Sequence, residues 1–343
     1  MDDHAVPVLP EAEGLMRLTT GLWASQTLAA AEQLGLCTFL SARQGATVAE
    51  VATGLDIKER PAEILLTACA ALGLLSRDGS RFVNTAMAES YLVRGGQYYL
   101  GDYVRMLTEY VYPGWMRVTD AIRADAPARV ISKEQQGIFE AGTRPKVFWD
   151  GLYPLSALTA RALAEAVDFS DARSLLDVGG GTGAFAIELC QRYPELRVTL
   201  FDLAFVCEHS AEKVEQLGLA GRIGVHPGDF FADPELPGGH DVILLSMILH
   251  DWDEPRNTDL LAKCFQALPS GGRLVISELL VDDEKTGPVN AALMSMNMLV
   301  GTWGRNYTVA EYSEWLRKAG FEQLSTVRFT APGANGAVIA VKP

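Results

Sequence analysis

The second half of the chain alternates short β-branched runs with stretches of helical length. The runs SLLDVG, RVTLFD, RIGVHP, HDVILLS and GRLVISEL follow one another between residues 174 and 279. Strands that alternate with helices form a parallel sheet covered on both faces, so this part predicts an α/β domain over residues 166–343. Two further runs, LSTVRFT and GAVIAVKP, are joined only by the turn APGANG. They predict a hairpin with one antiparallel strand at the edge of the sheet.

The first run leads into a glycine-rich turn, DVGGGTG, at residues 177–183. Glycines at alternate positions let the backbone turn sharply and approach a ligand just ahead of a helix N-terminus. We therefore expect Asp177, Gly179, Gly181 and Gly183 to bind a cofactor. Gly179, Gly181 and Ala184 also satisfy the loose dinucleotide fingerprint G-x-G-x-x-A, so the turn alone does not name that cofactor.

Acidic residues end the next two strands. Asp202 lies 19 residues after Gly183, where a carboxylate can accept both hydroxyls of a ribose. This indicates an adenosine-bearing cofactor without separating NAD from S-adenosylmethionine. The third strand ends in GDFF, where Asp229 could accept from the amino group of an adenine and Phe230 could stack on its ring. The alternative is that Asp229 only caps a helix.

The fourth strand leads into the segment SMILHDWDEP, at residues 246–255. Its His250 sits at the carboxyl end of a parallel strand, where α/β sheets place their ligands. An imidazole with an ordinary pKa of about 6.5 suits a general base near neutral pH. The fifth strand ends in Glu278, which should lie beside His250. A carboxylate behind an imidazole fixes its tautomer and stabilises its protonated form, as in a catalytic triad.

The first half of the chain begins with an apolar segment at helical spacing, residues 14–40. A helix that is apolar nearly all round must be buried, either in its own domain or against a partner. The next segment predicts helix, turn, helix and a short hairpin with Asp78-Gly79 at its tip, which is the order of a winged helix. We expect a winged-helix-like dimerisation domain over residues 1–100 and a helical linker over residues 101–165 that contributes to the substrate pocket.

Charge argues against nucleic acid as a partner. The chain carries a net charge of -14, whereas nucleic-acid affinity comes largely from Lys and Arg. The would-be recognition helix, residues 56–72, holds two basic and three acidic side chains, so it lacks the basic face of a DNA reader. Protein–protein contact, and hence a homodimer, is the better interpretation of this domain.

Composition bounds the cellular setting. No uncharged apolar stretch reaches the roughly 18 residues of a transmembrane helix, so we expect no membrane partner. The five cysteines are scattered without a CxxC pair, which favours buried thiols in the reducing cytoplasm over a disulfide or zinc framework. We expect no metal.

These motifs, in this order behind a winged-helix domain, resemble the plant-type O-methyltransferases of the caffeate and acetylserotonin kind. Bacterial relatives in antibiotic and pigment biosynthesis look closest, and the HDW element at residues 250–252 is the most specific part. The resemblance implies a class I methyltransferase, Rossmann-like sheet with S-adenosylmethionine as cofactor and S-adenosylhomocysteine as product. It assigns the cofactor to the glycine turn, Asp202, Asp229, Phe230 and Trp252, and the role of base to His250.

Two departures from the family pattern concern the site. The family has a lysine near the cofactor four residues before the histidine, where this chain has Ser246. It also flanks the histidine with a second glutamate, and Asn306 stands at the corresponding position of the run GRNYT. A neutral amide can hold a hydrogen bond but cannot stabilise an imidazolium by charge, which leaves Glu278 as the sole flanking carboxylate.

The sequence thus predicts methyl transfer to a hydroxyl of an aromatic secondary metabolite, with His250 as base, Glu278 as its orienting partner and Asn306 beside them. We expect an apolar acceptor pocket between the domains, lined partly by Met294, Asn297, Met298 and Trp303. The alternatives are an N- or C-methyltransferase of the same fold, a family member with non-methylating chemistry, and a ligand-responsive winged-helix regulator.

Overall fold

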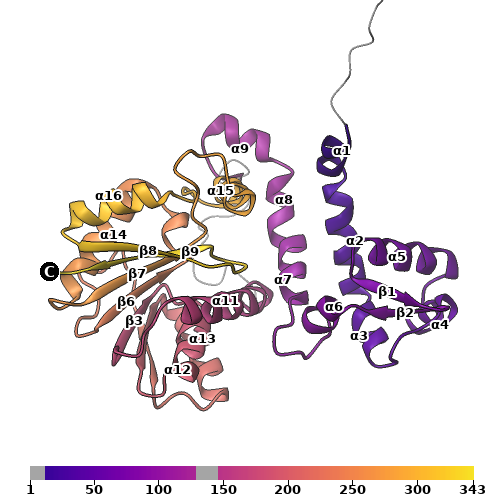
Figure 1. Ribbon diagram of the computed structural model, residues 1–343, viewed down its shortest axis with the longest axis horizontal. Coiled ribbons are helices and arrows are strands. Elements are labelled where there is room, and N and C mark those ends of the chain that lie inside the picture. Colours follow the sequence, from indigo (N-terminus) through magenta and orange to yellow (C-terminus); the bar gives the residue numbers. More distant parts are fainter. Residues whose placement is uncertain (1–11, 129–145) are drawn as a thin grey trace, which may run out of the picture. The chain divides into compact units, whose positions relative to one another are not determined.

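The structure of the protein, a computed structural model, describes residues 12–128 and 146–343 (Figure 1). The chain divides into two compact units, Met1–Arg105 and Met106–Pro343, and each is described by itself. The three-part division expected from the sequence stays a prediction. The first unit consists, in chain order, of α1 (Glu13–Thr19), α2 (Gly21–Gln33), α3 (Leu36–Ser41), α4 (Val48–Gly54), α5 (Glu59–Ala71), β1 (Leu75–Asp78), β2 (Arg81–Asn84), α6 (Ala86–Tyr91) and the start of α7 (Gly101–Met106).

The apolar segment at residues 14–40 is three helices rather than one. Thr20 interrupts it first, and its hydroxyl donates to the Met16 carbonyl at 2.8 Å. Gly35 interrupts it again with φ +70°, a left-handed conformation that a helix interior does not allow. In this chain Leu15, Leu18, Leu22 and Trp23 of α1 and α2 are 52–80% exposed, so these two helices leave an apolar face uncovered.

The winged-helix order predicted after this segment is present. Thr47 caps α4 in a capping box with Glu50, and α5 leads into the antiparallel pair β1–β2. Gly79 turns that hairpin with φ +58°. Leu36, Leu66 and Phe82 pack in one buried cluster, so the helices and the hairpin share a core.

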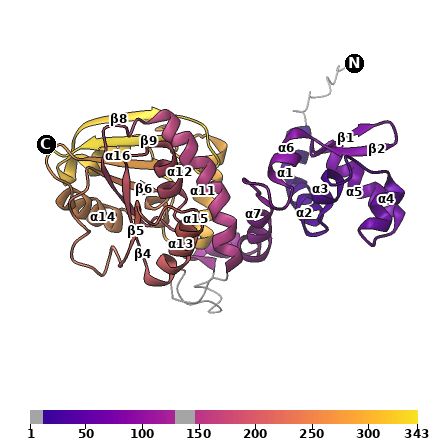
Figure 2. The ribbon, with the colours of Figure 1, turned by 90° about the horizontal axis from the view of Figure 1, so that it is seen from below.

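The second unit is a seven-stranded sheet with helices on both faces. It consists of the end of α7, η1 (Leu107–Val111), α8 (Tyr112–Trp115), α9 (Val118–Ala124), α11 (Lys146–Ala166), β3 (Ser174–Val178), α12 (Ala184–Arg192), β4 (Arg197–Asp202), α13 (Ala204–Gln216), β5 (Ile223–Pro227), β6 (Val242–Ser246), η2 (Leu249–Asp251), α14 (Glu254–Ala267), β7 (Arg273–Glu278), α15 (Val289–Gly301), α16 (Val309–Ala319), β8 (Glu322–Arg328) and β9 (Gly336–Val341). Two buried clusters cover the sheet: α11, α12 and α13 pack on one face, and α14 and α16 on the other. Seen from below in Figure 2, α11 crosses in front of the strands.

The predicted fold class is confirmed: the strand order is β5-β4-β3-β6-β7-β9-β8, and the first five of these strands run parallel. The position expected for the antiparallel strand was wrong. That strand is β9, which pairs with β7 on one side and β8 on the other, so it lies inside the sheet. Strand β9 (GAVIAV) is mostly buried, whereas β8 (EQLSTVR) is mostly exposed. The more apolar strand therefore takes the covered position, and β8 forms the edge.

This topology collects the candidate residues. The parallel strands β3, β4, β5, β6 and β7 all end at one edge of the sheet, and the turn between β8 and β9 reaches the same edge because β9 runs antiparallel to β7. Within the described ranges, no helix combines the length and the apolar character that crossing a membrane requires.

Candidate active site

The glycine turn after β3 is wound in left-handed conformations. Gly179, Gly181 and Gly183 have φ values of +70°, +56° and +77°, which only glycine adopts readily. A β-carbon at Gly179 would meet the side chain of Ile248, and the Phe230 ring lies 3.7 Å from that position. The turn is thus pressed against the segments that follow β5 and β6, and helix α12 begins directly after it.

Two carboxylates, the buried Asp177 and the half-buried Asp202, lie at the turn. Asp202 accepts hydrogen bonds from the Gly181 N–H at 2.8 Å and the Leu203 N–H at 2.7 Å, and burial nevertheless raises its pKa to about 6. Burial, reinforced by the charge of Asp202, raises the pKa of Asp177 to about 7. Its Oδ2 is buried without a hydrogen-bond partner among the described residues. A carboxylate oxygen that lacks a donor within the protein suits a ligand that brings its own hydrogen-bond donors.

An aromatic cluster borders the turn. Phe230, Phe231 and Trp252 meet edge to face, with ring centroids 4.7 to 6.2 Å apart. Asp229 supports the cluster through its Oδ1, which accepts from the N–H groups of Phe231 at 2.8 Å and Ala232 at 3.2 Å. One carboxylate oxygen of Asp229 is therefore committed to a turn, close to the capping alternative considered from the sequence.

His250 and Glu278 are neighbours, as their strand-end positions predict. The His250 Nδ1 lies 2.7 Å from the Glu278 Oε2. The other oxygen, Oε1, accepts from the backbone N–H groups of Leu249 at 3.1 Å and His250 at 3.4 Å. Glu278 is fully buried and His250 is 7% exposed. One carboxylate thus fixes both the imidazole and the short helix η2 that carries it.

The ionisation of His250 follows from these neighbours. Burial by itself lowers its pKa, but the charge of Glu278, the hydrogen bond that the imidazole donates to that carboxylate and the charge of Asp251 outweigh burial and raise the pKa to about 9. At neutral pH the free protein therefore holds an imidazolium against Glu278. The other ring nitrogen, Nε2, lies 4.0 Å from Asp251 Oδ1.

Ser246 and Asn306, the two departures from the family pattern, are both buried. Ser246 ends β6, and its hydroxyl has no hydrogen-bond partner within the described part of the chain. Asn306 receives a fixed position, since its N–H donates to the Ser295 Oγ at 3.0 Å and its Nδ2 to the Leu279 carbonyl at 2.8 Å. Asn306 therefore holds the residue that follows Glu278.

The predicted acceptor residues lie on or just after α15, which contacts η2. Asn297 is already engaged: its Oδ1 accepts from Trp115 Nε1 at 2.9 Å, and its Nδ2 lies 3.8 Å from the Met294 sulfur. Met298 is 8% exposed and Trp303 is 48% exposed. The contact of α15 with η2 brings these residues near His250, and their role in binding the acceptor stays a prediction.

Residues that the sequence did not single out hold the His250 turn in place. Asn257 donates through its Nδ2 to the Leu249 carbonyl at 2.9 Å and the Trp252 carbonyl at 3.1 Å. Gly304 packs directly on this backbone, because a β-carbon there would meet the His250 oxygen and the Trp252 nitrogen. Such contacts join distant segments and carry no periodic signal in a sequence.

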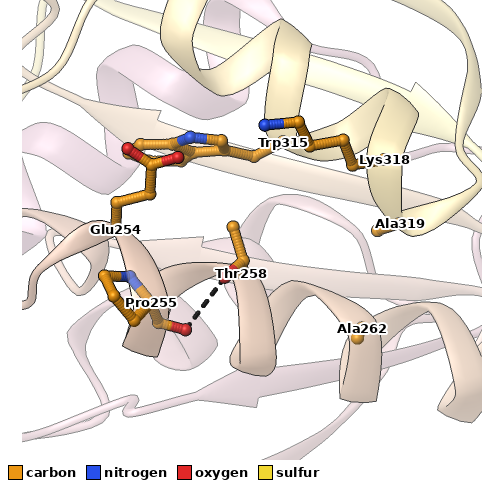
Figure 3. Close-up of a pocket in the computed structure, with 7 residues that line it drawn as sticks. All are labelled: Glu254, Pro255, Thr258, Ala262, Trp315, Lys318 and Ala319. Carbon is orange, nitrogen blue, oxygen red and sulfur yellow. Dashed lines mark hydrogen bonds between the residues drawn. The ribbon is translucent and has the colours of Figure 1, made fainter.

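A separate groove of about 480 Å³ lies between α14 and α16 (Figure 3). Its sides are formed by Trp315 and Lys318 of one helix and by Glu254, Thr258 and Ala262 of the other. It contains none of the predicted site residues. Among residues 12–128 and 146–343, no cluster of His, Cys, Asp or Glu is arranged to hold a metal ion.

Comparison with known proteins identifies the family. The profile of the O-methyltransferase domain matches residues 115–322, and that of the O-methyltransferase dimerisation domain matches residues 16–94. The chain is 56% identical over 328 residues to the 3-hydroxy-5-methyl-1-naphthoate 3-O-methyltransferase of Streptomyces sahachiroi, covering 96% of this chain and 94% of the relative. The chain belongs to the O-methyltransferase family.

Two further relatives bear on the cofactor and the reaction. Human N-acetylserotonin methyltransferase in complex with S-adenosylmethionine superimposes on this methyltransferase with a TM-score of 0.87 at 28% identity, over 98% of this chain and 99% of the other. The N,N-dimethyltransferase OxyT of Streptomyces rimosus is 33% identical over 98% of this chain and 99% of its own. The protein is an S-adenosylmethionine-dependent O-methyltransferase with a dimerisation domain, and the resemblance stated from its motifs is confirmed.

The contact at Gly304 yields a first prediction for the methyltransferase. In Gly304→Ala the new β-carbon displaces the backbone of residues 250–252, so we expect kcat to fall at least about tenfold. The matched control is Gly301→Ala, because a β-carbon at Gly301 has no atom within 4 Å. Equal kcat values in the two variants, measured with saturating cofactor, would show that this close approach does not position His250.

Proposed function

We propose that this enzyme methylates a phenolic hydroxyl of a hydroxynaphthoate-type aromatic acid and that His250 removes the phenolic proton. The observation that carries the proposal is the buried His250–Glu278 pair at the strand ends, with Nδ1 occupied at 2.7 Å and Nε2 left for the acceptor. The acceptor class is supported by the relative of 56% identity, whose name specifies a hydroxynaphthoate.

The residues around the glycine turn fit the cofactor. The left-handed glycines keep side chains away from the turn, the orphaned Asp177 Oδ2 and the Asp202 carboxylate can accept from an ammonium group or a ribose, and Phe230 can stack on adenine. We propose that Asp177, Asp202, Asp229, Phe230, Ser246 and Trp252 hold it together with the turn. When bound, S-adenosylmethionine supplies an electrophilic methyl group on a positively charged sulfur.

The phenolic hydroxyl and the His250 imidazolium have similar pKa values in this site. A phenol has a pKa of about 10 and His250 a pKa of about 9, so transfer of the proton from the hydroxyl to Nε2 is nearly thermoneutral. The phenolic oxygen gains electron density as its proton leaves, which makes it the nucleophile. Glu278 and Asp251 then stabilise the imidazolium. The base must be unprotonated before each turnover, so the reactive fraction rises as the pH passes through about 9.

The kinetics of His250 variants test the base. We expect His250→Gln to lower kcat by roughly 10²- to 10⁴-fold while affinity for S-adenosylhomocysteine, measured by calorimetry, stays within about twofold. In the wild type kcat/KM should rise with pH through a midpoint near pH 9, and His250→Gln should lose that limb. Most of the wild-type turnover surviving in His250→Gln would mean that positioning alone drives transfer.

Product analysis tests the acceptor. We expect 3-hydroxy-1-naphthoic acid to give an O-methyl product with S-adenosylmethionine, and the matched aminonaphthoic acid to give none. NAD should not bind. The second candidate is N-methylation, favoured by the OxyT relative and by the neutral Asn306. Turnover of only the amine would withdraw the oxygen assignment while the fold and the cofactor stand.

The acceptor pocket is proposed to include Met294, Asn297, Met298 and Trp303. What supports it is the contact of α15 with η2, which carries His250. The amide of Asn297, bonded to Trp115, would then orient the pocket wall as much as the acceptor itself. We further propose a cytoplasmic enzyme that binds no nucleic acid, supported by five free, buried cysteines and the net charge of -14.

We propose that the enzyme is a homodimer through its first unit. The dimerisation domain at residues 16–94 and the exposed side chains of Leu18 (80%) and Trp23 (69%) support this. Light scattering should give the mass of two 37.1 kDa chains, and the double variant Leu18→Glu/Trp23→Glu should move it toward one. The control is Leu217→Glu, at a residue 44% exposed in the second unit. A wild-type mass of one chain at micromolar concentration would contradict the proposal.

A further inference from the structure

The segment that leaves β7 needs support that the sheet does not provide. The ladder between β7 and β9 ends at the pair Glu278–Gly336, so the backbone of Leu279 and Leu280 has no strand partner. Both residues are at most 2% exposed. Their N–H and C=O groups must therefore be satisfied by other parts of the protein. This matters for the site because Glu278, which holds His250, is the last residue of the strand.

Asn335, in the turn between β8 and β9, satisfies that backbone. Its Oδ1 accepts from the Leu280 N–H at 2.7 Å, and its Nδ2 donates to the Leu280 carbonyl at 3.0 Å. Its own backbone N–H donates to the Glu278 carbonyl at 3.0 Å. Asn335 thus makes three hydrogen bonds to the backbone of Glu278 and Leu280. Its side-chain amide bonds the N–H and C=O of Leu280 as the backbone of a neighbouring strand would. Arg328 Nη1 lies 3.5 Å from the same Oδ1.

The neighbouring residues make this contact specific to asparagine. The next residue, Gly336, is pressed against the Leu280 side chain and the Val327 carbonyl, so Asn335 is held close to its partner. A leucine of similar size offers neither a donor nor an acceptor, and an aspartate keeps the acceptor but loses the donor. From a second segment, Asn306 donates to the Leu279 carbonyl at 2.8 Å. The two amides hold consecutive residues directly after Glu278.

We propose that Asn335 is a positioning residue for the His250–Glu278 pair: it fixes the backbone from which the Glu278 carboxylate reaches the imidazole. It acts through Glu278 and touches neither cofactor nor acceptor. The inference rests on the proposed role of His250 as far as activity is concerned. The geometry of the pair can be read without activity, because the charges that act on His250, those of Glu278 from β7 and Asp251 from η2, set its titration.

The test compares Asn335→Leu and Asn335→Asp with Asp241→Ala. Asp241 is a matched control because its Oδ2 accepts from the N–H groups of Arg173 at 2.8 Å and Ser174 at 2.9 Å at the opposite end of the same sheet. We expect Asn335→Leu to lower kcat at least about tenfold with the S-adenosylhomocysteine Kd within about twofold. Asn335→Asp should fall between it and the wild type. Asp241→Ala should lose thermal stability but keep kcat.

The titration of His250, followed by NMR of the imidazoles, separates this proposal from the proposed function. The chain has five histidines, so His250→Gln identifies the signal. A loosened Glu278 should lower the pKa of His250 by roughly one unit in the Asn335 variants and leave it in place in Asp241→Ala. If Asn335→Leu does not fold, Asn335→Asp carries the same measurement. If the Asn335 variants keep both the pKa of His250 and the wild-type kcat, the positioning role is overturned. If the pKa of His250 shifts in these variants but activity does not depend on His250, only the proposed role of His250 as base is overturned.

Discussion

The contact between Glu278 and His250 is the interaction on which the rest of the site depends. Burying a carboxylate away from water costs free energy. Here the fully buried Glu278 recovers that cost because its oxygens accept hydrogen bonds from the imidazole at 2.7 Å and from the two N–H groups at the start of η2. The same bonds tie the end of β7 to the turn after β6. The His250–Glu278 pair therefore connects the ends of β6 and β7 and also raises the pKa of His250.

Side-chain amides hold the backbone on both sides of the His250–Glu278 pair. Asn257 spans the carbonyls of Leu249 and Trp252, and the Tyr307 hydroxyl donates to the same Trp252 carbonyl at 2.6 Å. Asn306 holds the residue after Glu278. Amides suit this task because they carry no charge: the Nδ2 groups of Asn257 and Asn306 satisfy buried carbonyls and leave the electrostatics to Glu278 and Asp251. The Oδ1 atom of each of these two amides is buried without a hydrogen-bond partner among the described residues.

The substitution at Asn306 has an electrostatic consequence. With one flanking glutamate in the buried pair, the protonated imidazole and the carboxylate sum to zero charge, whereas a second glutamate would leave a net negative charge. A neutral pair costs less to bury, and it stabilises the imidazolium less than two carboxylates would. Ser246 likewise carries no charge where the family pattern has a lysine.

The sequence by itself determined the strand–helix alternation, the left-handed glycine turn and the meeting of His250 with Glu278, because period-two runs, glycine chemistry and the shared carboxyl edge of parallel strands are local rules. Only the tertiary structure decided the rest. The 14–40 segment divides into three helices, and β9 enters the sheet while β8 takes the edge. Neither Asn335 nor Gly304 was foreseen. A side chain that bonds backbone far away in the chain leaves no periodicity, and the order of a hairpin in a sheet depends on which strand buries more apolar surface once both faces are covered.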